Sequence, residues 1–469
     1  MRLLKKAWEW FDARTDASKV IGPLMRHPVP PGGQYSGWMY IFGSATLFAF
    51  LIQVFTGIAL ATAYVSSAGQ AFESLQWITN EAFLGRVLRG MHYFGASAMV
   101  LLVGIHMIRT FLTGSYKFPR ELNWVVGVLL LGLTVLMGFT GQLLRWDQNG
   151  VWSTIVAAEQ AGRVPIVGPW LARFIMGGQT VGGATLSRFF AYHVFFIPAI
   201  IFAMVGLHLV LVLRHGISEK PSASRPVDSK TYRAWYEDML KREGVPFWPD
   251  AAWRDVVFGF LVVASVIFLA WRVGPPALTT PPDPTIIQAY PRPDWYLLWY
   301  FAVLAQMPPT AENFVIIGAP LLAGVCLLIL PLIFSTGQRA PSRRPWAVAS
   351  IALIVVMVGT LWIQGERSPW SPDFDPRPLP ASVVQAATPE IAGGARFFET
   401  KGCQYCHAIS GSGGQRGPDL TTVGDRLSPQ LITLRILNGG HNMPPFASTL
   451  KPDEVTALVA FLQSRKTPP

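Results

Sequence analysis

Residues 89–122 read RGMHYFGASAMVLLVGIHMIRTFLTGSYKFPREL, an apolar stretch that holds two histidines and ends in a basic loop. A helix of about 20 apolar residues is long enough to cross a bilayer. His92 and His106 lie 14 positions apart, close to four helical turns, so both side chains face one side of such a helix. Histidine inside a membrane span is rare and usually functional, so this stretch predicts a functional site within a membrane.

A second stretch of the same kind occupies residues 186–218, LSRFFAYHVFFIPAIIFAMVGLHLVLVLRHGIS, and holds His193 and His208. Their spacing of 15 turns one side chain about 100° away from the other on a regular helix, and we expect a kink at Pro198 to absorb part of this rotation. One buried histidine alone is more often a hydrogen-bonded core residue than a ligand. Two pairs on two helices instead predict two iron sites about 21 Å apart, each held by one histidine from each helix.

Glycines repeat the same interval in two other apolar stretches. Gly43 and Gly57 lie 14 positions apart, and so do Gly127 and Gly141. Taken singly, such glycines serve the packing of membrane helices. Their match with the histidine interval indicates instead that flat porphyrins lie against these two helices.

The composition is that of a membrane protein. Of 469 residues, 51% are hydrophobic and 14% are charged, against about 25% charged in an ordinary soluble domain. The 17 Trp and 29 Phe residues suit aromatic belts at the membrane surfaces. The stretches long enough to span a bilayer are residues 38–62, 88–112, 124–144, 190–213, 254–273, 314–334 and 346–363.

The net charge of +11 reflects 38 Lys and Arg against 27 Asp and Glu. Nucleic acid, anionic lipid or a cytoplasmic membrane face would each suit it, but no basic patch lies outside the loops between spans. The loops at 109–122 and 335–345 are basic, so the positive-inside rule places them and the N-terminus in the cytoplasm. The C-terminus then lies outside a bacterial cytoplasmic membrane. Residues 1–14, with Trp8, Trp10 and Phe11 among basic residues, indicate an interfacial helix.

A small soluble domain ends the chain. Residues 366–384 form a Pro-rich linker, and residues 385–469 return to soluble composition. Cys403, Cys406 and His407 form the CxxCH pattern of covalent haem c attachment, in which the histidine is an iron ligand. A chance CxxC or a redox dithiol would explain the cysteines but not the adjoining histidine.

The sixth ligand of this iron is expected within residues 438–446, NGGHNMPPF. Met443, which precedes a proline, resembles the ligand of class I cytochromes c, and a His/Met pair raises the potential. His441 is the alternative ligand. Helices are expected around 390–401 and 452–464. Haem c is attached outside the cytoplasm, which agrees with the predicted topology.

The membrane part resembles the cytochrome b of the Rieske/cytochrome bc complexes. The matching stretches are residues 89–122, 138–148 (GFTGQLLRWDQ) and 186–218. The spacing of 15 is similar to that of chloroplast-type proteins, whose separate small subunit resembles the last three spans. The resemblance implies an all-α protein with a dihaem four-helix bundle in residues 1–218 and three further spans in residues 219–365, followed by the linker and a small helical cytochrome c domain.

This resemblance implies two haems b as cofactors, besides one covalent haem c. His92 and His193 would hold the outer haem, and His106 and His208 the inner one. Basic residues of the family face haem propionates or the inner quinone site at positions that correspond to Arg89, Arg109, Lys117 and Arg120. Solvated interface charge is the alternative for these four residues and stays open.

An outer quinol site is implied by Pro293, Asp294, Trp295 and Tyr296. The family has Pro-Glu-Trp-Tyr here, and its carboxylate helps to take a proton from quinol. Asp294 keeps a carboxylate, which can accept a proton when it is partly desolvated. Its side chain is one methylene shorter than the glutamate of the family. The Asp form is commoner in menaquinol-using relatives, so menaquinol is expected rather than ubiquinol. An interface anchor with an incidental aspartate is the alternative.

Departures from the family pattern carry their own expectations. Ile41 stands where some relatives have a cysteine that holds an extra haem, so no third membrane haem is expected. Cys326 is expected to be a buried packing residue. Arg145 stands where the family has proline before Trp-Asp-Gln. No CxH…CxxH signature occurs, so the Rieske iron–sulfur protein is expected as a separate subunit.

The resemblance implies a cytochrome b–c fusion subunit of a proton-translocating quinol:cytochrome c oxidoreductase. Quinol oxidised at the outer site would give one electron to the Rieske protein and one to the b haems, and quinone would be reduced at the inner site. Electrons would leave through haem c to a cytochrome c or an oxidase. A homodimer in membrane lipid, without nucleic acid, is expected. The alternative is an electron-conducting membrane anchor, but such four-helix subunits lack the last three spans and the Pro-Asp-Trp-Tyr loop.

Overall fold

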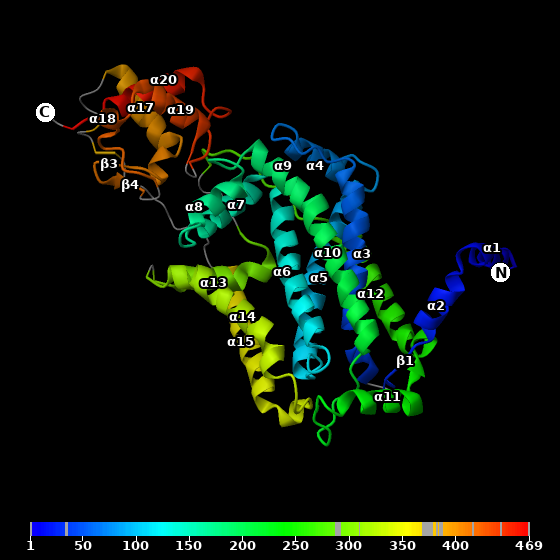
Figure 1. Ribbon diagram of the computed structural model, residues 1–469. Coiled ribbons are helices and arrows are strands. Elements are labelled where there is room, and N and C mark those ends of the chain that lie inside the picture. Colours follow the sequence, from blue (N-terminus) through cyan, green and yellow to red (C-terminus); the bar gives the residue numbers. More distant parts are fainter. Residues whose placement is uncertain are drawn as a thin grey trace.

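Helices make up most of the structure (Figure 1). The computed structural model describes residues 2–32, 36–286, 292–308, 310–367, 379–380, 383, 388–414, 417–440 and 443–467. Long helices form the membrane part, and a smaller helical domain lies beyond one end of it. The predicted all-α fold is therefore confirmed, while most of the expected linker lies outside the described residues.

Within the residues that the structure describes, seven helical segments are long and apolar enough to cross a membrane, as predicted. They are α3 (Phe42–Ala61), α5 (Gly85–Leu112), α6 (Glu121–Leu143), α9 to α10 (Gly183–His215), η3 to α12 (Phe247–Arg272), η5 to α14 (Phe314–Ile333) and α15 (Pro345–Arg367). The fourth segment begins at Gly183 instead of the expected residue 190. The helix α9, which contains polar residues such as Ser187 and Arg188, precedes the apolar stretch and is continuous with it.

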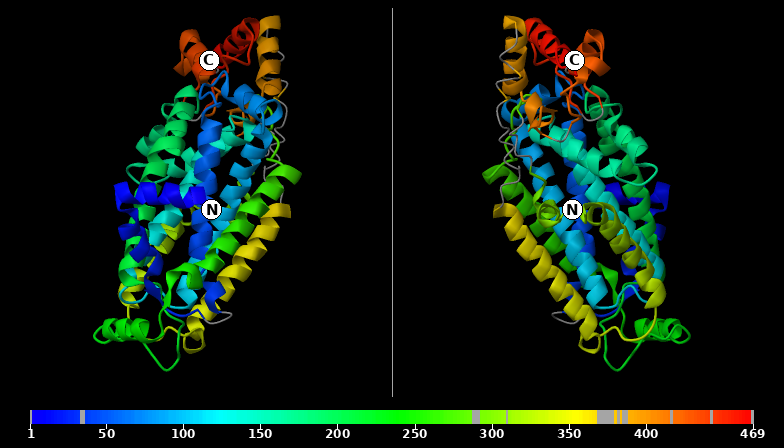
Figure 2. Two further views of the ribbon diagram at one scale, coloured as in Figure 1. Left: turned by 90° about the vertical axis from the view of Figure 1, so that its right-hand side faces the viewer. Right: turned by 90° about the vertical axis from the view of Figure 1, so that its left-hand side faces the viewer.

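Four of these segments, α3, α5, α6 and α10, form the bundle, and α12 packs against α3 and α5 (Figure 2). Small residues let the helices approach closely. A Cβ atom on Gly90 of α5 would lie 3.0 Å from the Cα atom of Ala270 in α12. A Cβ atom on Gly259 of α12 would overlap the ring of Phe48 in α3. Glycines thus fix where α12 meets the bundle.

A π-helical turn, η2 (Tyr192–Phe196), joins α9 (Gly183–Ala191) to α10 (Ile197–His215). The backbone N–H of Ile197 donates to the carbonyl of Tyr192, five residues earlier. Pro198 follows directly and has no N–H to continue the regular pattern. A π turn adds one residue to a helix, so the 15-residue interval from His193 to His208 aligns like an interval of 14. The rotation that a kink at Pro198 was expected to absorb is taken up here.

The two ends of the bundle carry different elements (Figure 1). One end, called the α11 end, is formed by α11 (Tyr232–Glu243) with the loops 113–120 and 334–344. The opposite end, called the α7 end, is formed by α4 (Ala71–Asn80), α7 (Gln148–Gly162) and α8 (Gly168–Met176). The C-terminal domain lies beyond the α7 end.

The N-terminal segment forms two helices, α1 (Arg2–Thr15) and α2 (Ala17–Arg26), that project from the bundle (Figure 1). The large apolar side chains expected to face an interface, Trp8, Trp10 and Phe11, are exposed. The short strand β1 (Pro28–Val29) pairs antiparallel with β2 (Val245–Pro246). This pairing ties the segment to the start of α12.

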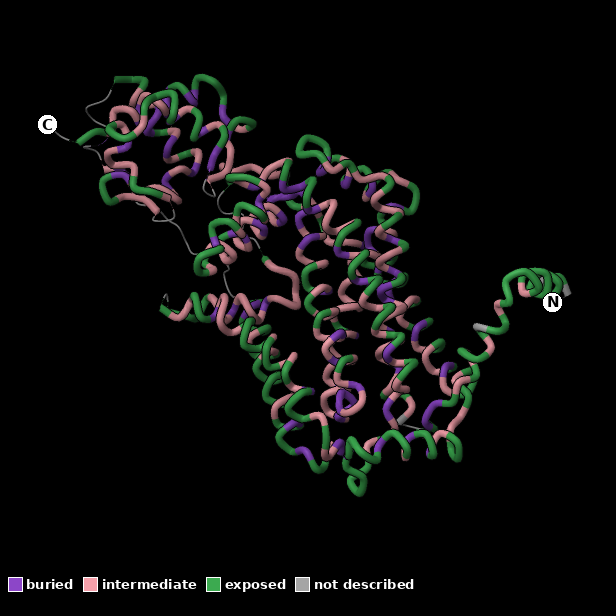
Figure 3. Tube along the Cα trace, in the orientation of Figure 1, coloured by how far each residue is buried: buried purple, intermediate pink, exposed green. Residues whose placement is uncertain are grey.

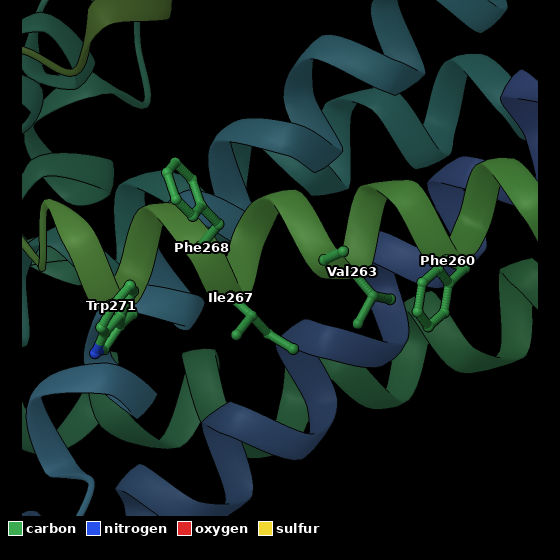
Figure 4. A pocket seen from close by; sticks show the side chains of 6 residues that line it. Phe260, Val263, Ile267, Phe268 and Trp271 are labelled. Carbon is green, nitrogen blue, oxygen red and sulfur yellow. The ribbon is translucent and has the colours of Figure 1, made fainter.

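The outward faces of the spans are apolar (Figure 3 colours the chain by exposure). Figure 4 shows a shallow hollow on α12 that is lined by Phe260, Val263, Ile267, Phe268 and Trp271. Exposed apolar side chains are the normal surface of a helix in lipid. Cys326 of α14 is exposed on such a face, so the expectation that it is a buried packing residue is wrong. The apolar run predicted burial, but in a membrane an apolar side chain is equally stable facing lipid.

In the described part of the C-terminal domain, four α-helices pack around one core: α17 (Pro389–Thr400), α18 (Val423–Arg426), α19 (Pro429–Asn438) and α20 (Pro452–Gln463). The strands β3 (Ala408–Ile409) and β4 (Ser412–Gly413) form a small hairpin. The two helices expected in this domain correspond to α17 and α20. They pack at Gly394, where a Cβ atom would overlap the carbonyl oxygen of Ala457.

Gly394→Val should destabilise the C-terminal domain because the valine side chain would force α17 away from α20. We expect a loss of about 1–3 kcal/mol or more in its free energy of unfolding. Gly393→Val is the matched control, since a Cβ atom there meets nothing within 4 Å. Urea-dependent proteolysis of the full chain, read as the yield of the C-terminal fragment, compares the two. Equal losses would contradict the proposed packing role of Gly394.

Candidate haem and quinol sites

The four membrane histidines form two pairs inside the bundle. The ring centroids of His92 in α5 and His193 in η2 lie 6.1 Å apart, with an angle of 76° between the rings. Those of His106 in α5 and His208 in α10 lie 6.5 Å apart, at 72°. Two imidazoles that bind one metal ion from opposite sides, each at about 2 Å, place their centroids about 6 Å apart. Both pairs therefore fit a bis-histidine iron.

Threonine hydroxyls orient the pair nearer the α7 end. The Nδ1 atom of His92 lies 2.9 Å from the Oγ1 atom of Thr56, and that of His193 lies 3.1 Å from the Oγ1 atom of Thr140. Each hydroxyl donates to a carbonyl of its own helix, Ile52 for Thr56 at 2.6 Å. The hydroxyls thus accept from Nδ1–H, which leaves Nε2 of both rings available for a metal.

Each of the four expected glycines faces one of these imidazole rings. A Cβ atom added to each glycine would lie close to a ring Cε1 atom: 3.3 Å for Gly57 on His92, 2.6 Å for Gly141 on His193, 3.2 Å for Gly43 on His106 and 3.6 Å for Gly127 on His208. The equal intervals of 14 in the sequence thus correspond to contacts between glycine backbone and imidazole. The sequence predicted that porphyrins lie against these glycines. In the structure the atoms nearest to the glycines belong to the histidine rings that would ligate the haem iron.

A cavity of about 690 Å³ opens beside the pair nearer the α11 end. His106, His208, Gly43 and Gly127 line it, together with the polar side chains of Ser44, Asp255, Tyr40 and Arg109. The guanidinium of Arg109 lies 3.8 Å from the centroid of the Tyr40 ring. Its Nε and Nη2 atoms have no hydrogen-bond partner within the described part of the chain. Buried unpaired N–H groups on the cavity wall fit an acidic or carbonyl group of a bound molecule.

The other three basic residues are also buried, so they are not solvated surface charges. At the α7 end, Arg89 donates to Thr79 Oγ1 at 2.9 Å and to the carbonyl of Pro276 at 3.0 Å. At the α11 end, Lys117 donates to the carbonyl of Phe334 at 2.6 Å. Arg120 donates to the carbonyls of His215, Gly216 and Ile217. Burial, followed by the charges of Arg344 and Arg339, lowers the pKa of Lys117 to about 8.

The Pro-Asp-Trp-Tyr residues lie at the start of a short helical turn, η4 (Trp295–Leu297), that leads into α13 (Leu298–Gln306). The Tyr296 hydroxyl donates to Oδ2 of Asp294 at 3.1 Å and lies against Gly138 of α6. Trp295 donates through Nε1 to Oγ of Ser97 in α5 at 3.2 Å. Burial raises the pKa of Asp294, and the Tyr296 hydrogen bond and the Arg145 charge offset part of this rise. The carboxylate is therefore a better proton acceptor than an exposed aspartate.

In the C-terminal domain the CxxCH residues follow α17. Cys403 lies in the turn η7 (Cys403–Tyr405), and the Nδ1 atom of His407 lies 2.8 Å from the carbonyl oxygen of Pro418. This contact leaves Nε2 available for a metal. Met443 pairs with Gly440 and packs against the core of the domain. His441, the alternative ligand, lies outside the described residues.

Two groups of polar residues were not predicted from the sequence. Thr56 and Thr140 each precede a glycine that faces a histidine, so the repeated Thr-Gly pair was an available signal. Residues 145–149 form a series of hydrogen bonds to the segment before Asp294, and no local pattern marks such a contact.

Comparisons with known proteins find family matches over most of the chain. Residues 97–284 match the family model described as Cytochrome b(N-terminal)/b6/petB, and residues 281–374 match Cytochrome b(C-terminal)/b6/petD. Residues 389–462 match Cytochrome C oxidase, cbb3-type, subunit III.

Relatives of known name match just under half of the chain. The menaquinol:cytochrome c reductase cytochrome b subunit of Geobacillus thermodenitrificans is 38% identical over 221 residues, which are 46% of this chain and 99% of that protein. Cytochrome b6 of Synechococcus elongatus is 38% identical over 215 residues, again 46% and 99%. A solved structure, "Hyperthermophilic respiratory Complex III", aligns with a TM-score of 0.66 at 27% identity over 77% of this chain and 91% of that chain.

These matches confirm the resemblance that residues 89–122 and 186–218 indicated. The family matches together cover residues 97–374 of the membrane part and most of the C-terminal domain. The chain therefore belongs to the cytochrome b family, spans the membrane several times and carries a cytochrome c domain at its C-terminal end.

Proposed function

We propose that this chain is the cytochrome b–c fusion subunit of a proton-translocating quinol:cytochrome c oxidoreductase of the complex III type. It oxidises quinol at the α7 end and reduces quinone in the cavity at the α11 end. The observation that carries this proposal is the placement of a half-buried carboxylate, Asp294, at the same end as the cytochrome c domain, with two stacked histidine pairs leading to the opposite end. A membrane anchor for another enzyme needs no such carboxylate.

The histidine pairs are proposed as the ligands of two haems b. His92 and His193 hold the haem at the α7 end, and His106 and His208 hold the one at the α11 end. His407 and Met443 ligate a haem c that Cys403 and Cys406 attach covalently. When bound, these groups accept and release single electrons. The centroid distances and the ring nitrogens left available support the assignment.

Asp294 is proposed as the proton acceptor for quinol. Oxidation of one quinol releases two electrons and two protons. Asp294 takes one of these protons from a quinol hydroxyl, which its partly desolvated carboxylate favours, and both protons are released to the outer solution. Tyr296 holds the carboxylate in place through its hydroxyl. One electron goes to a separate Rieske iron–sulfur subunit and the other enters the membrane part of this chain.

The remaining assignments follow from the same picture. The α11 end and the N-terminus lie in the cytoplasm, and the cytochrome c domain lies outside, because the basic loops at the α11 end obey the positive-inside rule. Menaquinol is the proposed substrate, supported by the aspartate in the quinol motif and by the name of the Geobacillus relative. A homodimeric complex and a cytochrome c or oxidase as acceptor complete the proposal.

Haem content tests the cofactor assignment. The purified subunit should contain two haems b for each haem c, because two histidine pairs and one CxxCH segment supply the ligands. Ile41 offers no attachment for a third membrane haem. A pyridine haemochrome spectrum measures the ratio, and covalent haem staining of the chain should vanish in a Cys403→Ala, Cys406→Ala double variant. A ratio of one or three would contradict the assignment.

Gly141→Val should remove the haem b at the α7 end and leave the other. The new side chain would occupy the space of the His193 ring, whose Cε1 atom lies 2.6 Å from a Cβ atom placed there. Gly132→Val on the same helix is the control, since nothing lies within 4 Å of a Cβ atom at that position. Redox difference spectra should show one haem b in the first variant and two in the second. Retention of both haems in Gly141→Val would rule out His193 as a ligand in this geometry.

Asp294→Asn should slow quinol oxidation by about 100-fold or more, because the amide cannot accept a proton. The spectra of all three haems should be unchanged. Asp294→Glu restores a carboxylate and should recover most of the rate. Quinol:cytochrome c reductase turnover of the assembled complex is the measurement. Full turnover in Asp294→Asn would exclude its proton role.

A further inference from the structure

A guanidinium with an unpaired N–H group lies on the wall of the cavity at the α11 end. Arg254 is the third residue of α12 and lines this cavity beside Asp255. Its Nε atom is buried and has no hydrogen-bond partner within the described part of the chain. A buried N–H group left unpaired is unfavourable and rare in folded proteins. The orphaned Nε–H therefore points to a partner that the cavity receives.

The N-terminal loop leaves room for this guanidinium by means of two glycines. A Cβ atom on Gly37 would lie 2.9 Å from Cζ and 3.1 Å from Nε of Arg254, and one on Gly32 would lie 3.4 Å from Nη1. The ring centroid of Trp253 lies 4.8 Å from the same Cζ atom. The guanidinium is thus held by packing against bare backbone and an indole ring, and this packing uses none of its N–H groups.

The wall that carries these glycines is fixed to the start of α12. The strand β1 pairs with β2, and the Phe247 N–H donates to the carbonyl of His27 at 3.0 Å. The rings of His27 and Phe247 are stacked, with 5.1 Å between their centroids and 22° between their planes. Both residues line the cavity. The N-terminal loop and Arg254 are therefore held in one arrangement on this side of the cavity.

Arg254 reaches the cavity from a different direction than Arg109, the other cation with unpaired N–H groups there. Arg109 lies on α5, three residues after His106, and so belongs with the group that the histidines would hold. The helix α12 carries no histidine and packs against α3 and α5 from outside the four-helix bundle. The ligand of Arg254 is therefore a second molecule beside that group.

The neighbours of Arg254 favour a neutral ligand. Asp255 accepts a hydrogen bond from the Ser44 hydroxyl, and both residues line the cavity. A carboxylate or a phosphate bound at Arg254 would meet the like charge of Asp255, whereas a carbonyl oxygen carries no net charge. The N-terminal segment adds the apolar side chains of Leu24 and Met25 to the wall. A ring with carbonyl groups and an apolar tail fits this combination.

We propose that Arg254 is a quinone-binding residue: its guanidinium donates a hydrogen bond to one carbonyl oxygen of a quinone in the cavity at the α11 end. This inference rests on the proposed function. Reduction of the quinone to quinol takes two electrons, which arrive through the membrane part of the chain, and two protons from the cytoplasm. Negative charge develops on the carbonyl oxygen as electrons arrive, and a fixed cation in a partly dry site stabilises that charge.

The test isolates this cavity in the assembled Asp294→Asn complex, in which quinol oxidation at the α7 end is slow. A short-chain naphthoquinol then delivers electrons through the α11 end, in reverse of the proposed direction, and stopped-flow absorbance records the reduction of haem b. The dependence of the rate on quinol concentration gives a half-saturation concentration. Adding Arg254→Gln should raise it about tenfold or more, because a hydrogen bond from a charged donor is lost.

Four further variants in the same background serve as controls. Arg254→Lys keeps the charge and should recover part of the affinity, since a point charge replaces the planar donor group. Gly37→Val should also raise the half-saturation concentration, because its side chain displaces the guanidinium without changing any charge. Gly22→Val, where a Cβ atom meets nothing within 4 Å, should leave it unchanged. Arg272→Gln removes an equal charge from the exposed opposite end of α12 and should also leave it unchanged.

Three outcomes overturn the proposal. The first is an unchanged half-saturation concentration in Arg254→Gln. The second is an unchanged concentration dependence together with a shifted haem b potential or a lost haem b, which would assign the guanidinium to a haem carboxylate. The third is an unchanged concentration dependence with less phospholipid in the purified complex, which would assign it to an anionic lipid.

The parental Asp294→Asn complex separates this inference from the proposed function. If naphthoquinol reduces no haem b there, quinone reduction in the cavity at the α11 end fails, and the role of Arg254 fails with it. If reduction is saturable there and Arg254→Gln does not change the half-saturation concentration, only the inference about Arg254 fails.

Discussion

Four imidazole rings, each set against the bare backbone of a glycine, determine how the helices of the membrane part are spaced. On one side Gly43 and Gly57 bring α3 onto the two histidines of α5, and on the other Gly127 and Gly141 bring α6 onto those of η2 and α10. A side chain at any of these glycines would take the space of a ring. The bundle therefore has two helix layers with the histidines between them. The outer helices, together with the segment that contains Asp294, attach to these two layers.

Regular intervals explain why much of this arrangement was predictable from the sequence. The two glycine intervals of 14, and the equal interval between His92 and His106, follow from helical periodicity alone. The interval of 15 between His193 and His208 does not fit this periodicity. The π turn that aligns the two side chains depends on backbone hydrogen bonds near Pro198, which the sequence does not reveal. The burial of Cys326 was wrongly expected because apolar sequence does not distinguish a lipid face from a core. The hydrogen bonds of residues 145–149 could not be predicted from the sequence, because they join segments more than 130 positions apart.

At the α7 end, a loop fixes the position of the Asp294 carboxylate. Loops tolerate sequence changes and are more mobile than helices unless their backbone N–H and C=O groups are hydrogen-bonded. Here the partners come from consecutive residues at the end of one helix and the start of the next, so the segment before Asp294 inherits the rigidity of α6 and α7. Trp295, which donates to Ser97 of α5, holds the other side of the motif. The carboxylate is thereby fixed between three helices although it belongs to none of them.

The two histidine pairs differ in their hydrogen bonds to threonine. The imidazoles near the α7 end give their Nδ1–H to Thr56 and Thr140, whereas Phe42 and Val126 stand at the corresponding positions before Gly43 and Gly127. A hydrogen bond donated from Nδ1 makes the other ring nitrogen a more electron-rich ligand. More electron-rich ligands favour oxidised iron, so at the proposed haem site of the α7 end these hydrogen bonds would lower the potential of a bound haem. A lower potential there would favour electron transfer towards the opposite end of the bundle, where quinone reduction is proposed.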